Sequence, residues 1–244
     1  MSIEIPWLGR EITFPPVASA LDSPNGLLAA GGDLTPQRLL AAYSQGIFPW
    51  YSGNEPILWW SPDPRTVLFP AELKISRSLA KTLRNSRYSI RFDGDFDAVM
   101  TACAALRNGQ PGTWITKEMR EAYGRLHRMG HAHCVETWID DQLAGGLYGV
   151  ALGRAFFGES MFSIVRDGSK LALVALVRHL QQQGFSVIDC QVHSSHLASL
   201  GARSIPRREF SDLLRELINF PAIPAIWAAA SFVHEPAKPS SCQS

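Results

Sequence analysis

Two polar side chains, Asp189 and Gln191, stand within the otherwise apolar run Val187–Val192. If this run is a strand, its side chains alternate, so Asp189 and Gln191 point to one face and Cys190 to the other. A carboxylate and an amide on one face can orient a substrate group and accept charge as a bond forms. An edge strand with a solvated outer face is the alternative interpretation. The polar segment His193–His196, which follows the run, favours a functional site.

A second carboxylate, Glu159, interrupts an apolar segment earlier in the chain. Regular alternation places Glu159 on the same face as Met161 and Ser163, opposite Ser160. If a crossover helix brings the two segments side by side, Glu159 lines one cleft together with Asp189 and its neighbouring amide. The alternative is a surface carboxylate on an exposed face of a sheet.

The cysteines and histidines do not form a recognisable metal or disulfide pattern. The four cysteines are far apart without any Cys-x-x-Cys pair, and His131-Ala132-His133 alone is weak evidence for zinc. We therefore expect no metal and no disulfide framework, which suits a reducing cytoplasm. The chain begins without a signal-peptide pattern, and it lacks an apolar run long enough to span a membrane. We expect a cytoplasmic protein.

A stripe of like charges marks one predicted helix. Ser76 should cap a helix over residues 77–86, in which Arg77, Lys81 and Arg84 recur at spacings that share a face. Like charges on one stripe destabilise a helix by themselves, so the stripe is either a solvated face or a phosphate-binding one. The whole chain carries 23 basic and 22 acidic residues, a balance that excludes a general polycationic coat.

The helices and strands expected around these residues indicate an α+β protein, in a chain of 244 residues. Residues 1–65 are rich in Pro, Gly and Trp and form a small N-terminal domain, with one helix over 37–44 and an aromatic loop. In that loop, Trp50 is the best candidate for a partly exposed stacking surface.

Residues 66–234 have a regular α/β texture with a mixed sheet. Three runs joined by hairpin-sized linkers predict an antiparallel meander over 134–139, 146–152 and 155–162. An apolar helix over 170–182 crosses over to the strand that carries Asp189. Residues 235–244 are expected to form a flexible tail.

The sequence resembles a known family along nearly its whole length. The resemblance is to the leucyl/phenylalanyl-tRNA–protein transferases. It is carried by these ordered blocks: Pro24–Ala29, Gly31–Leu34, Gly46–Trp50, Trp59–Arg65, Gly112–Thr116, Gly130–His133, Gly158–Ser163, Asp189–Gln191 and Ser199–Ala202.

The resemblance implies a small N-terminal domain followed by an acyltransferase domain of the GNAT type. It implies transfer of Leu or Phe, less readily Met, from Leu-tRNA or Phe-tRNA to proteins with an N-terminal Arg or Lys, which marks them for N-degron-dependent degradation. An aminoacyl ester is already activated, so neither a covalent intermediate nor a cofactor is expected. A monomer is expected.

The resemblance also implies roles for particular residues. Asp189 and Gln191 would be the catalytic pair, with Asp189 acting directly or through Gln191. Trp50 and Trp114 would shape the aminoacyl-adenosine pocket. Further substrate-binding residues would be Glu159, Tyr123, Leu147, Ser160 and Met161. The helix that would face the tRNA carries Lys74, Arg77, Lys81 and Arg84.

One position departs from the family pattern, which commonly has an asparagine three residues after the catalytic glutamine. This chain has Ser194 there, and a hydroxyl offers fewer hydrogen bonds than an amide. Two other functions compete with aminoacyl transfer. A coenzyme A-dependent N-acetyltransferase would bind pyrophosphate at the turn Val165–Ser169, where an aspartate would repel phosphate. A non-catalytic RNA-binding module would use Trp50 and the basic stripe, but it would not require the carboxylates and the amide.

Overall fold

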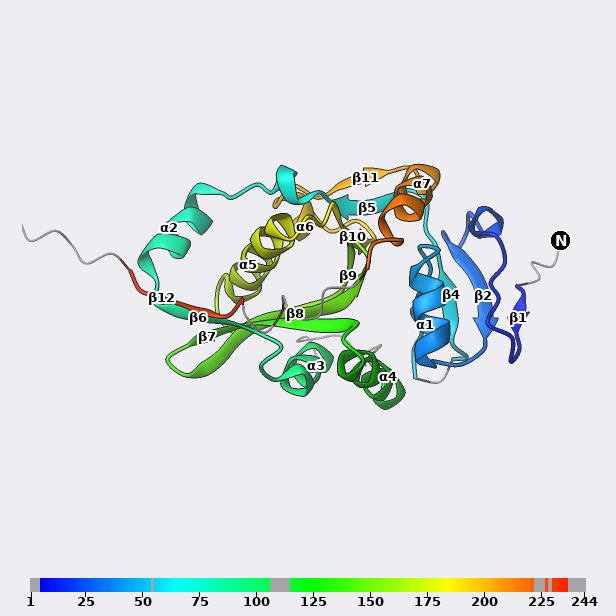
Figure 1. The fold of residues 1–244 in the computed structure, drawn as a ribbon, viewed down its shortest axis with the longest axis horizontal. Coiled ribbons are helices and arrows are strands. Elements are labelled where there is room, and N and C mark those ends of the chain that lie inside the picture. The colour runs from blue at the N-terminus through cyan, green and yellow to red at the C-terminus, as the bar shows by residue number, and fades with distance from the viewer. Residues whose placement is uncertain (1–4, 54, 106–114, 222–226, 228–229, 237–244) are drawn as a thin grey trace, which may run out of the picture.

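The computed structural model describes residues 5–53, 55–105, 115–221, 227 and 230–236, and its strands form two separate sheets. The small sheet lies at one end of the molecule, beside helix α1 (Pro36–Tyr43) (Figure 1). Its strands, in spatial order, are β1 (Trp7–Leu8), β2 (Leu27–Gly31), β4 (Leu58–Trp60) and β3 (Phe48–Pro49).

The large sheet is mixed. Its strands, in spatial order, are β11 (Arg203–Ile205), β5 (Arg65–Leu68), β10 (Val187–Gln191), β9 (Ala155–Ser163), β8 (Gln142–Leu152), β7 (Ala132–Ile139), β6 (Tyr88–Phe92) and β12 (Phe232–His234). The pair β9–β10 is parallel, and the other pairs are antiparallel. The predicted meander and the crossover to the Asp189 strand are confirmed, and so is the α+β class.

Helices cover both faces of the large sheet. Helix α5 (Gly168–Gln182) packs on one face, and α3 (Phe96–Ala104) and α4 (Lys117–Arg128) pack on the other (Figure 1). The remaining helices are α2 (Arg77–Asn85), α6 (Ser195–Ala198), α7 (Arg207–Leu217) and the short 3₁₀ turns Val17–Ser19 and Pro70–Glu72. As predicted, Ser76 caps α2, because its hydroxyl accepts a hydrogen bond from the Leu79 amide.

The apolar core is divided by the large sheet. One cluster lies beneath α5 and includes Phe156, Leu173 and Ile188. The other lies on the α3–α4 face and continues into the small sheet, where Trp59 is fully buried. The sequence favoured a loop for the segment around Trp59, but pairing of β4 with β2 and β3 makes it a strand. Tertiary pairing overrides the loop-forming composition here.

The parallel strands β9 and β10 separate part-way along their length. Their pairing runs from Val187 opposite Ala155 to Asp189 opposite Phe157. Beyond that point β9 continues to Ser163 paired with β8 but not with β10. At Gln191 the backbone of β10 takes a left-handed conformation with φ 58°, which ends the strand. The sheet therefore opens between these two strands, directly after Asp189.

Candidate active site

A cavity of about 880 Å³ occupies the opening between β9 and β10. Side chains from both faces of the large sheet line it, together with residues of the small sheet and of α3, α5 and α6. Its size is in the range of small-molecule binding sites. The residues that line it include Trp50, Leu147, Glu159, Ser160, Met161, Asp189, Gln191 and Ser194.

Glu159 is the acceptor at the centre of a polar cluster on this cavity. The Tyr43 hydroxyl donates to its Oε1 at 2.6 Å, and the Tyr123 hydroxyl donates to its Oε2 at 3.0 Å. The two hydroxyl oxygens also contact each other, and because each hydroxyl has one proton, all three hydrogen bonds can form together only when Glu159 is protonated. The Gln191 side-chain amide donates to Oε1 at 3.3 Å. Four groups from β9, α1, α4 and β10 thus converge on one point of the cavity wall.

The protonation of this cluster is set mainly by burial. Burial raises the pKa of Glu159 from 4.5 to about 7, and the charge of Asp189 adds to the rise, while the tyrosine hydroxyls and Arg65 oppose it. Burial also raises the pKa of both Tyr43 and Tyr123 well above 10, so the two phenols stay protonated and can donate. Glu159 is therefore divided between its acid and its carboxylate near neutral pH.

Asp189 is fully buried and paired with a fully buried arginine. The Arg65 guanidinium donates from Nε to Oδ1 at 2.8 Å and from Nη2 to Oδ2 at 2.6 Å, a bidentate ion pair. The guanidinium lies between the rings of Phe48 and Phe210, at 4.9 and 4.8 Å from their centroids. The Asp189 carboxylate is thus held in place and neutralised.

Gln191 links this buried pair to the cavity. Its backbone amide donates to Asp189 Oδ1 at 2.9 Å, and its side-chain amide reaches Glu159. A register shift between Asp189 and Gln191 accompanies the left-handed backbone. Because a non-glycine residue with positive φ is uncommon, the contact with the Asp189 carboxylate supports a conformation that the chain would otherwise disfavour.

The predicted face of Glu159 is partly wrong. In the register of β8 and β9, Tyr148 lies opposite Ser160 and Gly149 lies opposite Gly158, so Glu159 is an extra residue in a bulge. The side chains of β9 after the bulge therefore point to the opposite faces from those that regular alternation predicts. Glu159 therefore faces the α3–α4 side together with Ser160, whereas Met161 packs on the α5 side. Ser163 is also on the α5 side, where its hydroxyl accepts from the Ser169 amide.

The α5 side of the cavity is mostly apolar, with Ser163 and Ser169 at one end. Leu147 and Met161, for which the resemblance implies substrate binding, line it. Four further apolar residues line it that sequence reasoning did not single out: Phe156, Leu173, Leu176 and Ile188. Their apolar character is typical of any core position, so a single sequence offered no signal that they border a cavity.

The remaining predicted substrate-binding residues lie in different surroundings. Trp50 is 49% exposed on the cavity wall, and its ring lies 5.6 Å from that of Trp60. Trp114 lies outside the described residues. Tyr123 is fully buried behind Glu159 and does not line the cavity, so its contact with the site is through that carboxylate. Ser194 lines the cavity ahead of α6.

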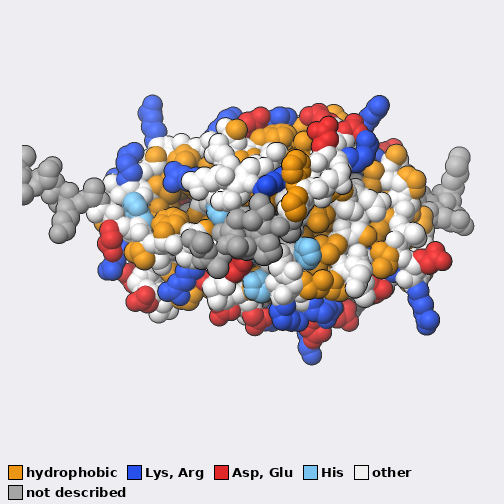
Figure 2. All heavy atoms as spheres, in the orientation of Figure 1, with side chains coloured by type: hydrophobic (Ala, Val, Ile, Leu, Met, Phe, Trp, Pro, Cys, Tyr) orange, Lys and Arg blue, Asp and Glu red, His pale blue; other side chains and the backbone are white. Residues whose placement is uncertain are grey.

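The predicted basic stripe is solvent-exposed on and before α2. Lys74, Arg77, Lys81 and Arg84 are all exposed. Among the described residues, none of these four forms an ion pair with a carboxylate. Figure 2 shows Lys and Arg side chains at the end of the molecule where α2 lies in Figure 1. The stripe is separate from the cavity and lies on the outer side of α2.

Three further features of the sequence concern the Cys190 thiol, metal binding and membrane-spanning helices. Cys190 points into the core on the α5 side, and burial raises the pKa of its thiol, as expected for a packing residue. Across the described ranges, no three His, Cys, Asp or Glu side chains are grouped to hold a metal ion. In that same part of the chain, no helix combines the length and the apolar character needed to cross a bilayer.

Sequence reasoning missed two polar residues of the site. Arg65 follows the Asp63-Pro64 turn, and its partner Asp189 is 124 positions away. Tyr43 is buried on α1, and its contact with Glu159 depends on how α1 packs against α4 and β9. The hint in the sequence was that a buried Asp189 requires a cation, but the pattern does not indicate which one.

Known proteins resemble this chain closely. Residues 67–215 match the family described as leucyl/phenylalanyl-tRNA protein transferase, and residues 32–63 match its N-terminal domain. A leucyl/phenylalanyl-tRNA–protein transferase from Chromobacterium violaceum is 64% identical over 223 residues, covering 91% of this chain and 96% of the relative. One from Nitrosospira multiformis is 63% identical over 216 residues, covering 88% and 93%.

One similar solved structure is more distant in sequence. A GCN5-related N-acetyltransferase from Kribbella flavida is 10% identical, covers 69% of this chain and 60% of its own, and has a TM-score of 0.32. Likeness at this level has no bearing on the chemistry of the site.

Proposed function

This chain belongs to the leucyl/phenylalanyl-tRNA protein transferase family, whose donor is an aminoacyl-tRNA and whose acceptor is a protein, and we propose how its site performs the transfer. The donor is Leu-tRNA or Phe-tRNA, and less readily Met-tRNA. The acceptor is the N-terminal Arg or Lys of a protein that the transfer marks for N-degron-dependent degradation. Since charged tRNA is a cytoplasmic substrate, the reaction belongs in the cytoplasm.

The reaction replaces an ester bond by a peptide bond. The acceptor amine attacks the ester carbonyl carbon, the carbon–oxygen bond to the tRNA ribose breaks, and the amine loses a proton while the ribose oxygen gains one. The N-terminal amine has an ordinary pKa of about 7.7–8.0, so much of it must lose a proton at neutral pH. Holding ester and amine in attack geometry contributes about 7–11 kcal/mol to lowering the barrier.

Gln191 is proposed to orient the attacking amine. Its side-chain nitrogen donates to Glu159, and its Oε1 has no partner among the described residues. That oxygen can accept a hydrogen bond from the amine. Asp189 is held by Arg65 and holds the Gln191 backbone, so we favour the indirect role of Asp189 over direct contact with the amine.

Glu159 is the carboxylate available to a cationic acceptor. Arg65 neutralises Asp189, whereas Glu159 receives only neutral hydroxyl and amide donors. In its ionised form it supplies a counter-charge for an ammonium or guanidinium group, which accounts for a preference for Arg or Lys. Its pKa of about 7 also suits the removal of a proton from the amine.

The apolar α5 side of the cavity is proposed to receive the donated side chain. Leu147, Met161 and Leu173 present no hydrogen-bonding group that a leucine or phenylalanine side chain would leave unpaired. An apolar pocket separates close hydrophobic homologues by only about 1–3 kcal/mol, so relaxed selection among Leu, Phe and Met is expected. Trp50 is proposed to stack on the terminal adenosine, and the stripe on α2 to contact tRNA phosphates.

The observation that carries this proposal is the convergence of Glu159 and Gln191 on an apolar cavity at the opening of the sheet. The test is transfer of labelled leucine from Leu-tRNA to peptides that begin with Arg, Lys or Met, without any added cofactor. Arg- and Lys-initiated peptides should be labelled and the Met-initiated peptide should not. Absence of transfer with active charged tRNA, or a requirement for acetyl-coenzyme A, would contradict the proposal.

A further inference from the structure

A second cavity, here called the α5 cavity, lies on the side of α5 away from the active site. Its volume is about 570 Å³, which suits a small ligand. Helix α5 separates the two cavities, because Leu173 and Leu176 line the first whereas Val174 and Arg178 line the second. The walls come from α2, β6, α5 and β12, with these residues: Leu83, Tyr88, Phe92, Leu171, Val174, Ala175, Arg178, His179, Gln182, Gln183, Ala230 and Phe232.

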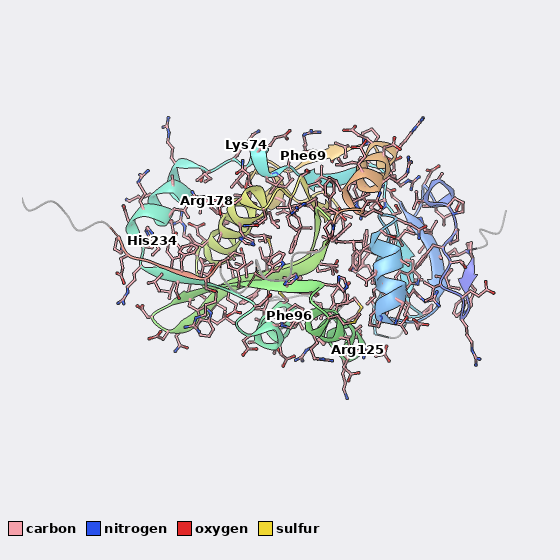
Figure 3. The ribbon with its side chains drawn as sticks, in the orientation of Figure 1. Phe69, Lys74, Phe96, Arg125, Arg178 and His234 are labelled. Carbon is pink, nitrogen blue, oxygen red and sulfur yellow. The ribbon has the colours of Figure 1, made fainter. Side chains whose placement is uncertain are left out.

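Among the described residues that line the α5 cavity, the polar groups include one cation and no carboxylate. Arg178 is exposed, and Figure 3 shows it between α5 and α2. Burial raises the pKa of Tyr88 and the positive charge of Arg178 opposes this shift, so the guanidinium lies near the phenol. Gln182, one helical turn further along α5, adds an exposed amide. This combination suits an anionic group beside a polar edge.

His179 provides a buried group whose partner is missing. It is 8% exposed, and its ring packs 5.0 Å from Phe92 and 5.4 Å from Trp227. Its Nε2 has no hydrogen-bond partner among the described residues. Burial lowers the pKa of His179, so the ring is neutral and offers one donor and one acceptor rather than a charge.

The α5 cavity adjoins the basic stripe. Leu83 of α2 lines the cavity, and the next residue, Arg84, belongs to the stripe that the proposed function assigns to tRNA phosphates. Aromatic rings, a polar edge and a cation are the groups by which proteins hold an unstacked base and its phosphate. We propose that the α5 cavity binds one nucleotide of the bound tRNA. The base contacts Tyr88 and the edge formed by His179 and Gln182, and its phosphate contacts Arg178.

This inference rests on the proposed function, and two donors separate their tests. One donor is Leu-tRNA, and the other is 2′(3′)-O-leucyladenosine, which reaches the active site but has no nucleotide for the α5 cavity. Gln182→Trp fills the mouth of the cavity from an exposed position. It should weaken the Kd for tRNA about tenfold, as expected for loss of one stacked base. Transfer from leucyladenosine should stay within about twofold of the unsubstituted protein, because α5 shields the active site.

Arg178→Ala should weaken tRNA binding and lower the salt slope of the binding constant by about one. Two controls match these changes. Gln181→Trp alters the adjacent exposed residue, which does not line the cavity. Arg125→Ala removes an exposed charge from α4, on the opposite face of the sheet (Figure 3). Both controls should bind tRNA as the unsubstituted protein does.

The outcomes are distinct. An unchanged tRNA affinity in the Gln182→Trp variant would overturn the inference about the α5 cavity. If the unsubstituted protein transfers leucine in the same experiments, the proposed function is unaffected by that result. AMP serves as the free-nucleotide probe. AMP binding that Gln182→Trp abolishes, together with unchanged tRNA affinity, would assign the cavity to a free nucleotide and overturn its assignment to tRNA. Failure of the unsubstituted protein to use either donor would instead count against the proposed function.

Discussion

The two carboxylates of the site have different environments, with Asp189 buried and Glu159 partly buried on the cavity wall. Asp189 shares a bidentate ion pair with Arg65 and is remote from solvent. Glu159 receives only neutral donors and has a raised pKa. Such a division allows one carboxylate to fix geometry while the other exchanges a proton or meets a cationic substrate.

Asp189→Ala should lower turnover far more than Cys190→Ala. Loss of the carboxylate releases the Gln191 backbone and leaves Arg65 unpaired, and breaking a buried pair costs about 3–5 kcal/mol of stability. Cys190 packs in the α5-side core and borders the cavity there, but it has no contact with Arg65 or Glu159 comparable to those of Asp189 and Gln191. The measurement is leucine transfer from Leu-tRNA at saturating substrate, with thermal unfolding of each variant alongside. Similar turnover in the two variants would contradict the assignment of faces on β10.

The free energy of unfolding of the Glu159→Gln variant should increase relative to that of the unsubstituted protein as pH rises. The folded-state pKa of about 7 exceeds the ordinary value of 4.5, so the folded protein binds the proton more tightly than the unfolded chain does. The free energy of unfolding of the unsubstituted protein therefore falls between about pH 5 and pH 7, where the group ionises against burial. Glutamine cannot ionise and should lack this loss. Urea unfolding at pH 5, 6, 7 and 8 measures the difference, and a constant difference would refute it.

At the scale of elements, the site is made by two interruptions of regular strand structure. A bulge at Glu159 leaves this carboxylate facing the tyrosines while the residues after it change faces, and the left-handed backbone of Gln191 ends β10 at the opening beyond Asp189. Bulges and strained residues concentrate at functional sites. Here they bring an amide and a carboxylate together from parallel strands whose backbones have already separated.

These interruptions also set the limit of prediction from sequence. Alternation correctly placed Asp189 and Gln191 opposite Cys190, because that strand is regular as far as Asp189. The same rule misplaced Glu159 relative to Met161, because a bulge depends on the register of the partner strand. Likewise, the cation that pairs with Asp189 is distant in sequence and lies at the junction of the two sheets, so the local pattern does not contain it.

The charge stripe on α2 should act through phosphate contacts. The double variant Arg77→Ala with Lys81→Ala should weaken tRNA binding and reduce the salt slope by about 1.4–1.8, since each lost contact contributes about 0.7–0.9. Binding titrations over a series of salt concentrations provide the measurement. Arg125→Ala with Arg128→Ala removes two exposed charges from α4 and serves as the control. An unchanged slope in the α2 variant would identify the stripe as a solvated face.

At the scale of the whole molecule, one apolar core joins the two sheets. We propose residues 1–65 and 66–234 as two domains by their separate sheets, but the α3–α4-side core runs through both. The Arg65 guanidinium strengthens this junction, because it lies between Phe48 of the small sheet and Phe210 of α7. The Asp189 carboxylate is therefore anchored where the two units meet.

Thermal unfolding should occur in one cooperative transition despite the two sheets. A shared core makes separation of the domains as costly as exposing that core. Calorimetry and tryptophan fluorescence should give the same midpoint, since four of the seven tryptophans lie in residues 1–65 and the enthalpy reports on the whole chain. Arg65→Ala should lower the shared midpoint without splitting it. Two resolved transitions would show that the units fold independently.

The depth of Glu159 has a consequence for the choice of acceptor in the proposed reaction. The carboxylate lies within the cavity wall, behind the surface that a folded partner could touch. An acceptor must insert its first residue, with the following backbone extended, to bring its amine to the ester. A protein whose N-terminus is buried in its own fold is therefore not an acceptor, whatever its first residue is. Accessibility of the chain end thus becomes a second criterion of selection, applied before any side chain is read.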